Sequence, residues 1–149
     1  MGSSCGEMNK WDIIDREKIK EILPHREPML MVDQVERVGE NEVLGIYTIQ
    51  QESWFLQGHF PGNPVVPGVI LCEIMAQPCC LLLTEKVKGK TPYLTGLNNV
   101  RFKRKVLPGD SIEIHCSLTK ERHPFYFAGA KCFVCGELAA SSEFSFALL

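Results

Sequence analysis

The sequence predicts a single α+β domain in which one long, buried helix packs on one face of a mostly antiparallel sheet of five to six strands. Three observations carry this prediction. The chain has 149 residues, 45% of them apolar, which suits one globular domain. Residues 69–86 are apolar on nearly all sides, which is typical of a helix buried around its whole circumference. Much of the last third alternates apolar and polar residues, as half-exposed strands do.

The remaining elements can be placed in order along the chain. Asp15 is a candidate N-cap of a short helix that Pro24 stops. Pro78 lies inside the long helix and is expected to kink it or to mark an irregular turn. The alternating pattern and the turn residues predict strands at 29–38, 43–50, 91–104, 111–118, 125–135 and 138–148, with turns at 39–41 and 136.

Composition argues against several classes of protein. The net charge of −2 gives no field that would attract nucleic acid or a membrane surface. Residues 1–9 are polar and lack the apolar core of a signal peptide. A membrane span needs about 20 nearly uncharged apolar residues, and the longest apolar stretch, 65–83, is interrupted by proline, glycine and Glu73. We interpret residues 1–11 as an N-terminal tail and 12–149 as the domain.

The seven cysteines form an odd number, which suits a reducing cytoplasm better than a disulfide framework. Cys132 and Cys135 form an isolated CxxC without a second pair at metal-binding spacing. The motif also falls in an expected strand, where residues three apart point to opposite faces. Small buried side chains are therefore the favoured interpretation of most of the cysteines, and no metal or cofactor is expected.

Glu73 is the anomaly of the long helix, because a buried charge is costly unless it is compensated. Gln77 lies four residues later on the same helix face. One interpretation is structural: the two side chains cross-link buried backbone groups. The other is functional: burial favours the protonated carboxyl, so that Glu73 holds a proton near neutral pH and serves as a general acid.

His59 is the second candidate for chemistry, in a loop stiffened by three prolines. By itself a histidine there would more often be a packing or surface residue. The third feature is Pro67-Gly68 at the start of the long helix, where free N–H groups and the helix dipole favour negative charge. A base, a buried acid and an N–H group facing a carbonyl are together what elimination of water beside a thioester carbonyl requires.

Several motifs resemble the FabZ-type 3-hydroxyacyl-[acyl-carrier-protein] dehydratases. The likeness runs from about residue 12 to the end of the chain. It combines the loop pattern GHFPxxPxxPG with a helix that contains ExMAQ, and this combination is specific. The matching stretches are LPHREPMLMVD at 23–33, WFLQGHFPGNPVVPGV at 54–69, EIMAQ at 73–77, NVRF at 99–102, VLPGD at 106–110 and CGELA at 135–139.

The resemblance implies a hot-dog fold, in which a curved sheet wraps the long helix, and a homodimer with its active sites at the subunit interface. It implies dehydration of (3R)-3-hydroxyacyl-[acyl-carrier-protein] to the trans-2-enoyl product in fatty acid elongation, without a cofactor. The catalytic pair falls on His59 of one chain and Glu73 of the other, and the N–H that polarises the thioester falls on Gly68. Phe60 and Gln77 are further expected substrate contacts. Whether dimers assemble into a trimer of dimers stays open, as does coenzyme A as an alternative carrier.

One position departs from the family pattern. The residue after Ala76-Gln77 is usually small, and here it is Pro78, which bears on the helix geometry and the acyl tunnel. A glutamate at 73 favours the plain dehydratase, since an aspartate there would resemble the related dehydratase/isomerase branch. The alternatives to a dehydratase are an acyl-thioester hydrolase on the same fold and a non-enzymatic acyl-thioester-binding module.

A basic stretch offers a candidate docking surface for the acidic acyl carrier protein. It consists of Arg101, Lys103, Arg104 and Lys105. In a strand, Arg101, Lys103 and Lys105 would share one face, with Phe102 on the other. The alternative is a solvated strand edge that charge protects from pairing.

Overall fold

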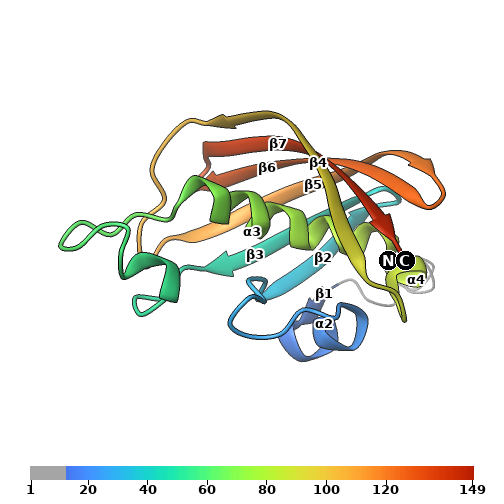
Figure 1. Cartoon of the computed structure of the whole chain (residues 1–149), viewed down its shortest axis with the longest axis horizontal. Helices are drawn as coiled ribbons and strands as arrows, with labels where there is room; N and C mark the ends of the chain where they lie inside the picture. Colours follow the sequence, from blue (N-terminus) through green and yellow to red (C-terminus); the bar gives the residue numbers. More distant parts are fainter. Residues whose placement is uncertain (1–12) are drawn as a thin grey trace, which may run out of the picture.

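The computed structural model describes residues 13–149, and the expected tail at 1–11 lies outside the described residues. Within this described part of the chain, seven antiparallel strands form one sheet in the order β1-β2-β3-β5-β6-β7-β4 (Figure 1). The strands are β1 Ile13–Asp15, β2 Gln34–Gly39, β3 Glu42–Thr48, β4 Pro92–Phe102, β5 Ser111–Arg122, β6 Phe125–Val134 and β7 Glu137–Leu148. The helices are α2 Arg16–Ile22, α3 Gly68–Cys80 and α4 Thr84–Val87, with 3-10 turns at Trp54–Leu56 and Leu81–Leu83.

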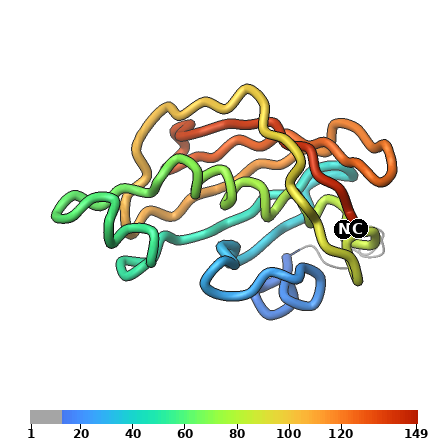
Figure 2. Tube along the Cα trace, viewed as in Figure 1, coloured from blue at the N-terminus to red at the C-terminus, as the bar shows by residue number. Residues whose placement is uncertain are grey.

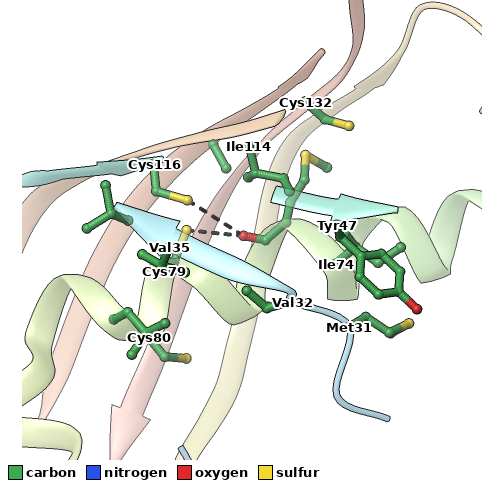
Figure 3. Packing of buried hydrophobic residues seen from close by; sticks show 14 of the residues in the cluster. Met31, Val32, Val35, Tyr47, Ile74, Cys79, Cys80, Ile114, Cys116 and Cys132 are labelled. Carbon is green, nitrogen blue, oxygen red and sulfur yellow. Dashed lines mark hydrogen bonds between the residues drawn. The ribbon is translucent and has the colours of Figure 1, made fainter. Parts of the chain in front are cut away.

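The long helix lies across the concave face of the sheet, which curves around it so that β4 passes over the helix (Figures 1 and 2). α3 packs against β3, β5, β6 and β7. The expected α+β hot-dog arrangement is therefore confirmed. Figure 3 shows part of the core, where the thiols of Cys79 on α3 and Cys116 on β5 both point to the Met75 carbonyl, at 3.4 and 3.9 Å.

α3 is less completely buried than the sequence pattern predicts. Val69 is 77% exposed, and Glu73 and Ala76 are only partly buried. These three positions follow helical spacing, so they form one stripe on the same side of α3. The sheet packs against the other sides of α3, so the apolar residues on those sides are buried while this stripe stays accessible to solvent.

Gly68–Val87 is apolar and long enough for a membrane span, but 72% of its most apolar window is buried inside the fold, as in the core helix of a soluble protein.

Two strand predictions need correction. The N-cap at Asp15 is confirmed, since its carboxylate accepts the Lys18 N–H, but residues 13–15 also form β1, which was not predicted. The strand expected at 29–38 begins only at Gln34. Its apolar first half, 29–32, is irregular and buried at Leu30, Met31 and Val32, where side chains rather than a neighbouring strand bond four backbone groups. Contact with β3 begins at Asp33, whose N–H donates to the Ile46 carbonyl at 2.8 Å.

The long helix expected at 69–86 is also interrupted. α3 runs through Pro78 and ends at Cys80, and the irregular turn lies just beyond, at Leu81–Leu83. Proline lacks an N–H and crowds the preceding turn, so a helix around it loses a hydrogen bond. The Pro78 ring packs on β3 at Gly45: a Cβ added to Gly45 would lie 2.8 Å from Pro78 Cγ. Proline at 78 therefore depends on glycine at 45.

We expect Gly45→Ala to destabilise the fold by about 1–3 kcal/mol, as overpacking of a core does. The added methyl group would meet a rigid ring that cannot rotate away. Chemical denaturation measures the loss. In a Pro78→Ala background the same substitution should cost clearly less, because the opposing ring is gone. Equal costs in the two backgrounds would contradict the contact as the cause.

The CxxC pair does not share one environment. Cys132 is buried in β6, where burial raises the pKa of its thiol to about 11, and Cys135 is exposed at the turn before β7. A thiol with so high a pKa stays protonated at neutral pH and is a poor nucleophile and metal ligand. The six cysteines in residues 13–149 are free, and five of them are buried.

Candidate active site

His59 lies in a closed loop whose backbone holds its ring in place. The Val65 N–H donates to the His59 carbonyl at 2.8 Å, and His59 Nδ1 lies 2.8 Å from the Val65 carbonyl. Because a carbonyl oxygen only accepts, Nδ1 carries the hydrogen, and the lone pair of the neutral imidazole is on Nε2. Phe60 stacks on the imidazole at 4.0 Å between ring centroids. The loop therefore presents Nε2 as a base in a fixed orientation.

Glu73 is held by Gln77, one helical turn away on α3. Gln77 Nε2 donates to Glu73 Oε2 at 2.8 Å and to the Met29 carbonyl at 2.7 Å. Gln77 Oε1 accepts the Met31 N–H at 2.8 Å, and the side chain is almost completely buried. The structural interpretation is correct for Gln77, which does cross-link buried backbone. It does not displace the functional interpretation of Glu73, whose carboxyl group stays partly exposed.

His25 also faces the Glu73 carboxyl group, with its Nε2 3.9 Å from Glu73 Oε2. The two residues line a cavity of about 90 Å³ together with Ala76, Gln77, Cys80, Pro92, Leu94 and Phe146. His25 Nδ1 is buried and has no hydrogen-bond partner among residues 13–149. Burial lowers the pKa of His25, and the nearby Glu73 charge opposes this only in part. A neutral imidazole is thus favoured beside Glu73. Sequence reasoning missed this placement, although His25 belongs to the LPHR segment of the resemblance.

Gly68 is the first residue of α3, and Phe102 covers it. A Cβ at Gly68 would lie 2.9 Å from Phe102 Cζ, so only glycine fits without displacing the ring. The Ile70 and Leu71 N–H groups both donate to the Pro67 carbonyl. Within residues 13–149, the N–H groups of Gly68 and Val69 have no protein acceptor. Two donors at the positive end of the helix dipole are therefore available to an oxygen that carries negative charge.

The basic stretch lies beside this helix start. Lys103, Arg104 and Lys105 line a hollow of about 390 Å³ whose wall also includes Gly68 and Phe102. The expected alternation along a strand is wrong beyond Phe102, because β4 ends there and the chain turns toward 108–110. Arg104 forms a 2.9 Å ion pair with Glu137 on β7.

The remaining cations of the basic stretch are exposed: Arg101, Lys103 and Lys105 are open to solvent.

Within residues 13–149 of one chain, no hydrogen bond or ion pair joins His59 to Glu73. His59 bonds within its own loop, whereas Glu73 accepts from Gln77 and faces His25.

The fold and these residues define a class: a single-domain hot-dog protein with groups suited to acyl-thioester chemistry. Residues 23–143 match the FabA-like domain family. The solved structure titled "The Dehydratase Heterocomplex ApeI:P from Xenorhabdus doucetiae" has the same fold, with a TM-score of 0.76 at 22% identity over 88% of this chain and 90% of that one.

Two relatives identify the family more closely. A 3-hydroxyacyl-[acyl-carrier-protein] dehydratase FabZ of Clostridium perfringens is 44% identical over 133 residues, which are 88% of this chain and 96% of the relative. The protein of the same name from Streptococcus sanguinis is 41% identical over 138 residues, or 91% and 99% of the two chains. The chain belongs to the FabZ family of 3-hydroxyacyl-[acyl-carrier-protein] dehydratases.

Proposed function

We propose that this chain is a cytoplasmic hydro-lyase that converts (3R)-3-hydroxyacyl-[acyl-carrier-protein] to the trans-2-enoyl thioester in fatty acid elongation. The observation that carries the proposal is the bond between His59 Nδ1 and the Val65 carbonyl, which leaves Nε2 as a base. Family membership supplies the substrate class, because the relatives are named for this reaction.

The elimination requires three groups to act together. His59 Nε2 removes the proton from C2, and the electron pair of that C–H bond forms the C2=C3 double bond. Charge that builds on the thioester oxygen is stabilised by the Gly68 N–H at the start of α3. Glu73 gives its proton to the C3 hydroxyl, which leaves as water. Proton return from His59 to Glu73 through solvent restores the starting state.

The site is completed by a second copy of the chain. Among the strands of residues 13–149, β4 is the last in the sheet order and pairs only with β7, which leaves one edge of this 11-residue strand open within the described part of the chain. It carries Tyr93, Leu94 and Leu97, which are exposed by 53%, 46% and 43%. Long apolar edges favour pairing with another chain. A homodimer through β4 would also cover the open stripe of α3 and bring the partner's loop to Glu73.

The assay uses purified protein and a 3-hydroxyacyl thioester on acyl carrier protein, and it follows the ultraviolet absorbance of the conjugated enoyl product. We expect turnover without added metal or cofactor. Release of free thiol in place of enoyl product would identify a thioester hydrolase. Binding of the acyl carrier protein without either reaction would identify a non-enzymatic module.

The carrier is proposed to dock on Lys103 and Lys105, beside the hollow at Gly68. Opposite charges mainly raise the encounter rate. Reversing both residues to Glu should raise KM several-fold for a carrier-linked substrate and leave a small-molecule thioester nearly unaffected. Added salt should weaken the wild-type carrier reaction, since exposed charges are screened beyond about 8–10 Å.

The matched control for docking is a double reversal of Lys88 and Lys90, two exposed lysines before the opposite end of β4. It makes the same change in net charge and should leave both KM values near those of the wild type. Equal KM increases from the two double reversals would show that net charge, not a local surface, governs docking.

A further inference from the structure

The segment 29–33 is held along its backbone by side chains from two different helices. Arg16 on α2 donates to the Leu30 carbonyl at 2.7 Å and to the Val32 carbonyl at 2.9 Å. Gln77 on α3 bonds the alternate groups, the Met29 carbonyl and the Met31 N–H. Leu30, Met31 and Val32 are almost completely buried, so the bonded backbone groups of these three residues would otherwise lack partners.

Arg16 is itself fixed by two carboxylates. Its Nε lies 2.9 Å from Glu27, and its Nη1 lies 3.2 Å from Asp33. Asp33 also accepts the Thr48 N–H at 2.9 Å, which ties the end of the segment to β3. The Arg16 side chain is 26% exposed, so most of it is withdrawn from water. The planar guanidinium group thus binds several oxygens at once, in a way that a lysine ammonium group would not reproduce.

Gln77 links the segment 29–33 to the candidate acid, Glu73. Gln77 has two amide hydrogens: one goes to the Met29 carbonyl and the other to Glu73 Oε2. Any shift of the segment therefore moves the amide that orients the carboxyl group. Because Oε2 is taken by Gln77, the other oxygen, Oε1, is the one free to carry a catalytic proton.

We propose that Arg16 is a positioning residue for Glu73, acting through segment 29–33 and Gln77. The inference rests on the proposed role of Glu73 as general acid. Arg16 touches no reacting atom, so its loss should act on kcat through the orientation of the acid and only weakly on KM. Misplacement of a reacting group by about 1 Å can cost a large factor in rate even when the substituted residue is remote.

The test compares Arg16→Ala, Arg16→Lys and the control Lys18→Ala, which lies on the same helix and, among residues 13–149, loses only an exposed pair with Glu21. We expect both Arg16 variants to lose about tenfold or more in kcat, with KM changed by less than about twofold. Lys18→Ala should match the wild type. Millimolar methylguanidinium should restore part of the kcat of Arg16→Ala and leave the other variants unchanged.

A second measurement separates positioning from a general loss of structure. In a Glu73→Gln background, Arg16→Ala should lower the residual rate no further, because the group it positions is already inactive. Wild-type kcat in Arg16→Ala, or a further loss in the Glu73→Gln background, would overturn the proposal. High activity of Glu73→Gln alone would instead overturn the proposed role of Glu73, which is a different outcome.

Discussion

Replacing Glu73 by glutamine is expected to lower kcat for dehydration by a factor of ~10² or more, the usual contribution of a general acid. Glutamine keeps the shape of the side chain, and its carbonyl oxygen can still accept the hydrogen bond from Gln77. It cannot supply the proton that the departing hydroxyl group needs. Steady-state rates and thermal melting should therefore show an inactive protein of near-normal stability. Near-normal turnover would mean that the carboxyl group is structural.

His59→Ala is expected to have a comparable effect, because no other histidine takes the orientation that the Val65 carbonyl imposes on His59. The control is His115→Ala, on the exposed face of β5. We expect the control to retain wild-type kcat. Loss of activity in both variants would point to a general sensitivity to histidine loss instead of a base at position 59.

Mixing the two inactive variants, Glu73→Gln and His59→Ala, is expected to restore dehydratase activity. In a dimer whose sites combine His59 of one chain with Glu73 of the other, a mixed dimer has one site with both residues and one with neither. After random exchange we expect about a quarter of the wild-type activity, since half of the dimers are mixed and half of their sites are intact. Subunit exchange is verified with two differently tagged chains.

An inactive mixture with confirmed exchange would show that both residues act within one chain. Heterodimers of wild type and the double variant His59→Ala/Glu73→Gln are the matched control. Such a dimer has no site with both residues when the sites are shared between chains. It has one complete site when each chain holds its own.

Much of the sheet was predictable because an antiparallel strand with one wet face carries its burial pattern in the local sequence. Residues 111–118 alternate strictly and form the start of β5. Residues 29–33 misled the same reasoning. The apolar run indicates burial, which holds for Leu30–Val32, but four backbone groups of the segment bond Arg16 and Gln77, which no local pattern connects to it.

The candidate site likewise has features that the sequence predicts and features that it does not. Glu73 and Gln77 were visible because two polar residues at helical spacing are unusual in an apolar helix, and their hydrogen bond was found. The placement of His25 beside Glu73 depends on how the chain packs between α2 and β2, which leaves no local signal. The alternation assigned to Lys103 and Lys105 failed because nothing in their spacing indicates that β4 ends at Phe102.

The contact between Pro78 and Gly45 has a consequence for the order in which substitutions can accumulate in this lineage. A chain with a larger residue at 45 would lose stability on acquiring proline at 78, because the ring and the side chain would occupy the same space. A chain that already has glycine at 45 can accept the proline without that clash. Glycine at 45 is thus the permissive step, and its reversal costs stability for as long as the proline remains.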